Sequence, residues 1–123
     1  MSRIRSHRDL IVWQKAMDMV VHVYKLAESF PQTETYRLTN QITRAAASVP
    51  ANIAEGHARS TAKDYAYFLA IAKGSLMEAE TFLMLAVRLT YLTEDQATPT
   101  LRLITEISKM LTVLRRRVLD SAR

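Results

Sequence analysis

The sequence contains no cysteine, only two glycines and three prolines, and no long uninterrupted apolar run. The lack of cysteine excludes disulfide bonds, thiolate zinc sites and thiol nucleophiles, and it suits the reducing cytoplasm, where we expect this protein. Two glycines are too few for a glycine-rich phosphate loop or for a collagen-like chain. A bilayer-spanning helix needs about 20 apolar residues, so we expect no membrane segment. The basic start is followed by no apolar segment, so we also expect no signal peptide.

The residue patterns of common catalytic and metal centres are missing as well. A di-iron bundle needs Glu-x-x-His on two helices, and that spacing does not occur. His7 and His57 are far apart, and His22 follows Asp18 at the spacing of a surface pair on a helix. Ser48 has no histidine near it in the sequence and no nucleophile elbow around it. We therefore expect no catalytic residue, no metal, no cofactor and no enzymatic activity.

What the sequence does contain is four segments with helical periodicity, in 123 residues of which 49% are apolar. A chain of this length can bury one hydrophobic core. Ser60 or Thr61 is a plausible helix cap, and Asp64, three residues after Thr61, supports Thr61. The run from Thr93 to Gln96 has the form of a capping box. Gly74 suggests close approach of another backbone, with a merely tolerated glycine as the alternative. We predict an all-α fold, an antiparallel up-down-up-down four-helix bundle. Its helices are expected at 9–29, 34–55, 62–92 and 93–120, in one domain spanning 9–123 behind a basic tail at 1–8.

Residues 41–56 are the most informative stretch, because they form three distinct sides when placed at about 100° per residue. Pro50 is expected to kink this helix, and Gly56 is expected to end it in a left-handed cap. One side is apolar and faces the core. The second side is polar and consists of Gln41, Arg44, Ser48, Asn52 and Glu55. The third side, where a surface helix normally carries charge, is small and uncharged: Thr43, Ala47, Pro50, Ala51 and Ala54.

The first helix also has more apolar surface than a single bundle can cover. One face carries Trp13, Met17 and Val20, and another carries a second set of apolar residues. Soluble monomers rarely expose contiguous apolar patches of more than a few hundred Å², so we predict a homo-oligomer; a loosely patterned monomer is the alternative. The residues expected at the interface between copies are Ala47, Ala51, Ala54, Val12, Ala16 and Val23.

The polar side of residues 41–56 has two interpretations. It is either a groove that faces a ligand or a hydrogen-bonded seam that fixes the register of helices or subunits, because buried polar groups must be paired. The sequence favours the seam and leaves the groove open.

The net charge of +5 is concentrated at the two chain ends. Residues 9–108 have nine basic and eleven acidic residues, so the excess of positive charge lies outside them. Side chains seven residues apart stay nearly on one side of a helix, and such a row along the fourth helix could neutralise phosphates without reading bases. A solvated surface is the alternative. The predicted nucleic-acid-binding residues are Arg102, Lys109, Arg115, Arg116, Arg117 and Arg123, with Arg3, Arg5 and Arg8 from the tail.

The stretch also resembles the signature Q-x-x-R-A-x-x-S-x-P-x-N-I-A-E-G of bacterial four-helix-bundle proteins encoded in intervening sequences of 23S ribosomal RNA genes. Here the pattern occupies 41–56, with further agreement at 9–16, at Phe68-Leu69, at Gly74-Ser75 and at Glu78. The similarity runs from about residue 7 to residue 92. One departure is Thr43, where many relatives carry a second arginine.

The resemblance implies a ring of five subunits, since related accessory proteins of diversity-generating retroelements form pentameric barrels. It also favours a non-enzymatic protein that binds RNA or another nucleic acid through basic surface residues, without deciding between RNA and DNA. The alternative is a scaffold that docks a partner protein and has no nucleic-acid role. A basic helix lying on anionic lipid is a third hypothesis.

Overall fold

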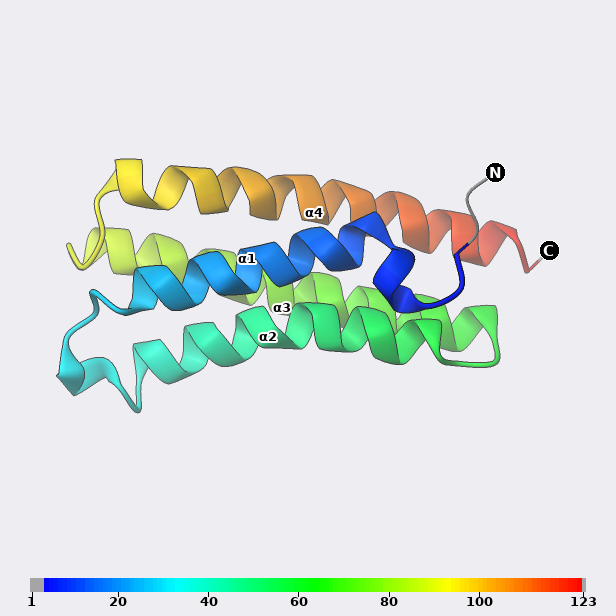
Figure 1. Ribbon diagram of the computed structural model, residues 1–123, viewed down its shortest axis with the longest axis horizontal. Helices are drawn as coiled ribbons and strands as arrows, with labels where there is room; N and C mark the ends of the chain where they lie inside the picture. Colours follow the sequence, from blue (N-terminus) through cyan, green and yellow to red (C-terminus); the bar gives the residue numbers. More distant parts are fainter. Residues whose placement is uncertain (1–3, 123) are drawn as a thin grey trace.

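The computed structural model describes residues 4–122 and contains four α-helices. They are α1 (Ile11–Ala27), α2 (Leu38–His57), α3 (Ala62–Arg88) and α4 (Glu94–Asp120), with the short 3-10 helices η1 (His7–Asp9) and η2 (Gln32–Glu34). No strand occurs within these residues, so the prediction of an all-α four-helix bundle is confirmed. In Figure 1 the chain runs along α1, returns along α2, and repeats this path in α3 and α4.

The helix starts follow the capping chemistry that the sequence predicts. The Thr61 hydroxyl accepts a hydrogen bond from the Asp64 N–H at 3.1 Å. Thr93 and Gln96 form the predicted reciprocal capping box, with bonds of 3.1 and 2.9 Å. Two starts lie later than expected: α1 begins at Ile11 after η1, and α2 begins at residue 38 after η2.

The end of α3 lies four residues earlier than expected, because Thr90 adopts the left-handed conformation with φ of 64°. The N–H of Tyr91 donates to the carbonyl of Ala86 at 2.9 Å, and that of Thr90 donates to Val87 at 3.0 Å. These two bonds form a Schellman cap. A threonine gives no sequence signal for this cap, which normally selects glycine.

The N-terminal segment is joined to the start of α1 by hydrogen bonds. The Asp9 carboxylate accepts the backbone N–H of Arg5 at 2.8 Å and that of Ser6 at 3.3 Å. The amide of Gln14 in α1 donates to the carbonyl of Arg8 at 2.9 Å. The boundary expected at residue 8 therefore falls inside an ordered helical turn.

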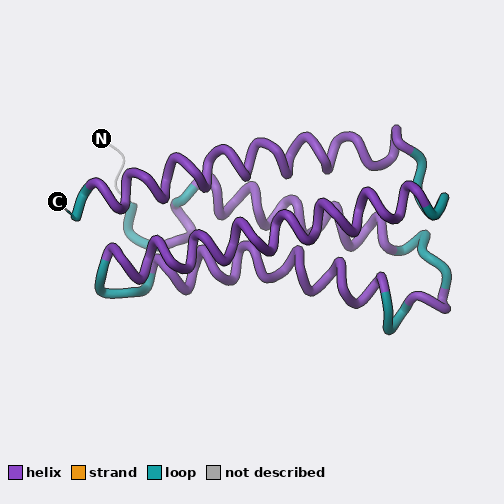
Figure 2. The backbone as a smooth tube through the Cα atoms, turned by 180° about the vertical axis from the view of Figure 1, so that it is seen from behind, coloured by secondary structure: helices purple, strands orange, loops and turns teal. Residues whose placement is uncertain are grey.

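The core is formed by apolar side chains from all four helices. Its largest fully buried members include Met19, Ile42, Ile53, Leu69, Leu76, Leu83, Ile104, Ile107 and Leu111. Figure 2 shows the helices lying side by side along the bundle, with the short connections confined to its two ends.

The two glycines have roles opposite to those expected. Gly56 has no positive φ and lies within α2, one residue before its end, so the predicted left-handed cap is wrong. A Cβ atom on Gly56 would lie 2.8 Å from Cβ of Phe68, so Gly56 marks the close approach of α2 to α3. Gly74 meets nothing within 4 Å at its Cβ position, so the close approach predicted there is absent from this chain. Pro50 is buried inside α2, which continues past it; the kink stays a prediction.

Half of the predicted oligomer interface lies inside the core, which corrects the sequence interpretation. Val12 is 4% exposed, and Ala16 and Val23 are fully buried. The first helix has two apolar faces, and periodicity alone does not say which of them turns inward. The face with Met17 and Val21, 42% and 49% exposed, is the outer one.

Candidate nucleic-acid interface

The predicted basic row lies along the exposed side of α4. Arg102, Lys109 and Arg116 are all exposed, as are Arg115 and Arg117. The described N-terminal segment and the C-terminal half of α4 lie at the same end of the bundle in Figures 1 and 2. Arg5 and Arg8 are exposed in that segment, whereas Arg3 and Arg123 lie outside the described residues. One end of the bundle thus carries most of the predicted cations.

Three basic side chains converge on a groove between α3 and α4, which we call the α3–α4 groove. Lys73 comes from α3, and Arg115 and Arg116 come from α4. The groove has a volume of about 550 Å³, and no acidic residue lines it within the described part of the chain. Ala70 and Gly74 line the α3 side of the groove, where their small size leaves space that larger side chains would fill. A concave surface of one charge concentrates the local field and attracts the opposite charge.

The fold orients two of these cations. The ammonium of Lys73 donates to the Thr112 hydroxyl at 2.6 Å across the groove. Arg115 donates from Nε to the carbonyl of Ala66 in α3 at 3.1 Å. A guanidinium has five N–H groups, so this single bond leaves most of its donors for other partners. Both side chains therefore bridge the two helices while keeping their charge at the surface.

Lys73 was missed by the sequence analysis. It lies in the part of the chain where basic and acidic residues nearly balance, and a helical wheel of α3 does not show which residues of α4 lie opposite. The only signal is the neighbouring Gly74, an exposed small residue in the middle of a helix.

Lys109 and Arg117 contribute to a different depression, which we call the α1–α4 groove. It has a volume of about 700 Å³ and is lined mainly by apolar side chains, among them Ile4, Ile11 and Val113. These three side chains are 51%, 60% and 42% exposed. The predicted basic row therefore follows the ridge of α4 between two grooves of different chemistry.

The polar stripe of α2 divides between the two interpretations left open by the sequence. Ser48 contacts Ser75 of α3 through their hydroxyl oxygens at 2.9 Å, and Asn52 donates to the Ser48 hydroxyl and carbonyl, both at 2.8 Å. This part is a hydrogen-bonded seam between α2 and α3. Gln41 and Arg44 instead line an open groove of about 340 Å³ beside that seam. Glu55 lies apart from both and pairs with Arg59 at 2.7 Å.

The small side of α2 remains accessible. Ala51 is exposed, and Ala47 and Ala54 are half-buried. With Pro50 they line a shallow apolar groove of about 390 Å³, the α1–α2 groove, whose opposite wall is formed by Trp13, Met17 and Val20 of α1. His7 also lines this groove and packs edge-on against Trp13, with ring centroids 5.0 Å apart.

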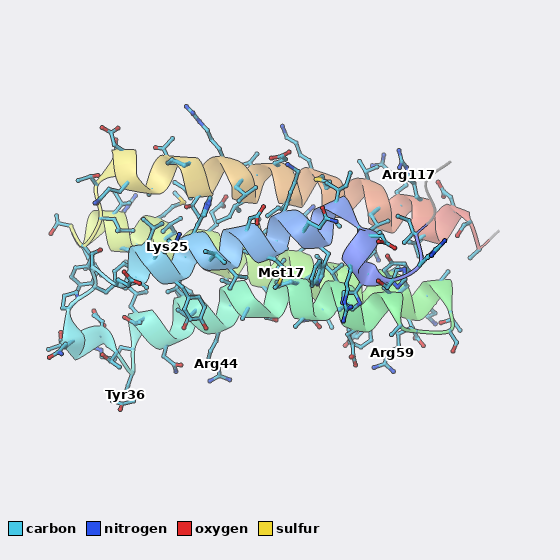
Figure 3. The ribbon with its side chains drawn as sticks, viewed as in Figure 1. Met17, Lys25, Tyr36, Arg44, Arg59 and Arg117 are labelled. Atoms are coloured by element: carbon cyan, nitrogen blue, oxygen red, sulfur yellow. The ribbon has the colours of Figure 1, made fainter. Side chains whose placement is uncertain are left out.

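The cations of the α3–α4 groove are not consumed by ion pairs within the described residues. The ion pairs found within residues 4–122 lie outside this groove. They join Lys15 to Glu106 at 2.9 Å, Arg37 to Glu34 at 3.6 Å, and Arg59 to Glu55. Figure 3 places Arg117 near the C-terminal end of α4, and Arg44 and Arg59 on the opposite edge of the bundle along α2.

Two tyrosines, Tyr65 and Tyr91, have a raised pKa. Burial raises the pKa of Tyr65, which lies half-buried against Gly56 and His57. A hydrogen bond to Glu34 raises the pKa of Tyr91, with a smaller contribution from burial. Neither tyrosine lines the α3–α4 groove.

Two further properties hold for residues 4–122. No group of three or more His, Asp or Glu side chains lies close enough together to hold a metal ion. None of the described helices combines the length and the apolar character required to cross a bilayer.

Known proteins provide an independent comparison. The family model described as 23S rRNA-intervening sequence protein matches residues 8–113. A crystal structure from Bacteroides thetaiotaomicron, of a protein with unknown function from the S23 ribosomal protein family, matches with a TM-score of 0.79 and 27% sequence identity. That alignment covers 85% of this chain and 98% of the other. No curated protein matches the chain. Because the family model covers most of the sequence, this chain belongs to the 23S rRNA-intervening sequence protein family.

Proposed function

We propose that this protein is a non-enzymatic, oligomeric helical bundle that binds RNA or another nucleic acid through its phosphates, in the cytoplasm. The observation that carries the proposal is the convergence of Lys73, Arg115 and Arg116 on one groove that no acidic residue lines. Lysine and arginine side chains that neutralise phosphates release counterions, and this release provides sequence-independent affinity. Contacts of this kind position a nucleic acid without reading its sequence.

The ridge of α4 extends the groove. Arg102, Lys109 and Arg116 recur every seven residues, and their Cα atoms stand about 10 Å apart at a rise of about 1.5 Å per residue. A backbone lying along α4 would meet one cation every few nucleotides. The family name refers to ribosomal RNA genes, which makes RNA the first nucleic acid to test.

Oligomerisation would repeat this basic surface. The α1–α2 groove and the α1–α4 groove are both lined mainly by apolar side chains, and they occupy different sides of α1. An interface that joins two different surfaces is heterologous, and heterologous contacts produce closed rings when the rotation between neighbours permits it. Two separate apolar surfaces therefore support a ring, such as the five-membered ring implied by the family resemblance, over a two-fold dimer.

The competing function is a scaffold that docks a partner protein, and the same exposed apolar grooves favour it. A salt titration separates the two functions. Short single-stranded RNA and DNA of equal length are titrated with the full chain at several salt concentrations, and the logarithm of affinity is plotted against the logarithm of salt concentration. Phosphate binding predicts a straight line with a slope of about −0.7 for each phosphate contacted.

The variants Lys109→Gln and Arg116→Gln should flatten this line. Affinity that does not change with salt, or no binding at micromolar protein, would contradict the proposal and favour the scaffold. Sedimentation with anionic vesicles tests the lipid hypothesis in parallel, and we expect no binding.

A further inference from the structure

The open groove beside the Ser48–Ser75 seam, which we call the α2–α3 groove, has the chemistry of a base-binding site. Its charged groups are Arg44 from α2 and Glu78 from α3, and its apolar wall is the half-buried ring of Phe82. Gln41 also lines it. Its volume of about 340 Å³ falls in the range of about 300–1,000 Å³ that is usual for small-ligand sites.

The floor of this groove is held by side-chain hydrogen bonds. The hydroxyls of Ser48 and Ser75 are 2.9 Å apart, and Asn52 donates to the Ser48 hydroxyl from the next turn of α2. These bonds hold α2 and α3 in one register. The groove therefore exists without a ligand, and binding would not have to order its walls.

The two charged groups have no ion-pair partner within the described residues, although they line one groove and have opposite charges. Arg44 is exposed and lines this groove, on the edge of α2 that lies between Tyr36 and Arg59 in Figure 3. Another exposed arginine of this edge is used by the fold: Arg59 pairs with Glu55 at 2.7 Å and lies over the Phe68 ring at 4.7 Å. The fold leaves Arg44 and Glu78 available to a ligand.

We propose that the α2–α3 groove binds an unstacked guanine base. Guanine carries acceptors at O6 and N7, which arginine recognises with two hydrogen bonds, and an N2 amino group that donates. Arg44 would donate to the acceptors, Glu78 would accept from the donor edge, and Phe82 would pack on the ring. Single-stranded RNA is read in this way, by stacking on aromatic side chains and by hydrogen bonds to base edges.

Adenine is the competing base, because glutamine pairs with its N6 and N7 and Gln41 is present. Arg44 and Glu78 favour guanine, since hydrogen bonds to ionised groups are about twice as strong as hydrogen bonds between neutral groups. The inference rests on the proposed function only where the guanine belongs to an RNA. A free guanine nucleotide has the same base chemistry and would fit the same groove.

The test is a nuclear magnetic resonance titration of the isotope-labelled full chain with guanosine, adenosine, cytidine and uridine monophosphates. The side-chain amides of Gln41 and Asn52 report on the groove. We expect guanosine monophosphate to shift them with an affinity about ten-fold higher than the other nucleotides, and guanosine without phosphate to shift them too. The Glu78→Gln variant should lose this preference.

The matched control is Arg59→Gln, which removes the same charge as Arg44→Gln from the same edge but outside the groove. Arg44→Gln should weaken guanosine binding about ten-fold, and Arg59→Gln should leave it unchanged. Equal shifts by all four nucleotides, a preference for adenine, or shifts confined to the α3–α4 groove would overturn the assignment.

Short RNAs that differ at one position, guanine or uracil, separate this inference from the proposed function. Salt-dependent binding of both RNAs with equal affinity would leave the phosphate-binding function intact and overturn guanine recognition. Binding of guanosine monophosphate without binding of either RNA would support the groove, with a free nucleotide as its ligand, and would contradict the proposed function.

Discussion

A Cβ atom placed on Gly56 of α2 would lie 2.8 Å from Cβ of Phe68 in α3, closer than two such atoms can pack. Because Phe68 Cβ is attached to the backbone, it cannot move aside without shifting α3. The closest approach of the two helices therefore depends on the absence of a side chain at residue 56.

The Gly56→Ala variant should be less stable. Alanine gains about 1 kcal/mol in helix propensity, but overpacking costs about 1–3 kcal/mol, so we expect a net loss of about 1 kcal/mol in the free energy of unfolding. Gly74→Ala is the matched control: it meets nothing within 4 Å and should gain up to about 1 kcal/mol. Denaturant unfolding of both variants measures the difference. Equal effects of the two substitutions would contradict the close approach.

The Schellman cap at the end of α3 is strained by its residue type. Thr90 has φ of 64°, and the left-handed conformation costs a residue with a side chain about 1–2 kcal/mol. Thr90→Gly should therefore raise the free energy of unfolding by about 1 kcal/mol, whereas Thr90→Ala keeps the Cβ atom and should bring little gain. A Thr90→Gly protein that melts at a lower temperature than the unsubstituted chain would show that this conformation is not maintained in solution.

Tyr91 and Glu34 link the end of α3 to η2. The Tyr91 hydroxyl donates to Glu34 Oε2 at 2.8 Å, and this bond raises the pKa of Tyr91 above the ordinary tyrosine value of about 10. The folded state thus favours the protonated phenol. The resulting stabilisation is present below the unfolded pKa and is lost as the pH rises through the higher folded pKa.

We therefore expect Tyr91 to ionise later than the exposed Tyr36 in an alkaline titration followed by tyrosinate absorbance. The difference between the unsubstituted chain and Tyr91→Phe isolates its signal. Replacing Glu34 with glutamine should bring its pKa back toward the ordinary value. If Tyr91 titrates together with Tyr36 in the unsubstituted protein, the hydrogen bond is absent in solution.

The oligomer prediction can be tested at Ala51, which is exposed in the α1–α2 groove. We expect a solution mass that is a multiple of the 14.0 kDa chain and a return to one chain in Ala51→Glu, because a buried unpaired carboxylate is costly. Thr105→Glu, on the exposed side of α4, should keep the oligomer. Light scattering after size-exclusion chromatography measures all three masses. An unsubstituted chain of 14.0 kDa at low concentration would remove the oligomer from the proposed function.

Local patterns in the sequence were sufficient to predict the four helices and two of their caps, because hydrophobic periodicity and the pairs Thr61–Asp64 and Thr93–Gln96 act within a few residues of one another. Local patterns could not predict how the helices pack against one another. Two apolar faces on α1 left the inward face undecided, so Val12, Ala16 and Val23 were placed at a surface that they do not reach.

The candidate site shows the same limit. The cations of α4 follow from their seven-residue spacing, whereas Lys73 becomes part of the site only because α3 packs beside α4. The polar stripe of α2 was visible in the sequence, but its division into a seam and a groove depends on Ser75 and Glu78 of α3.

The most direct test of phosphate binding in the α3–α4 groove is the salt dependence of RNA affinity in two variants of equal charge. One is Lys73→Gln/Arg116→Gln in the groove; the other is Lys25→Gln/Arg88→Gln, with two exposed cations on α1 and α3 outside it. On single-stranded RNA the groove variant should reduce the magnitude of the log–log slope by about 1.4, or about 0.7 for each lost contact, and the control should leave it unchanged. Equal slopes for the two variants would contradict the assignment of this groove to phosphate binding.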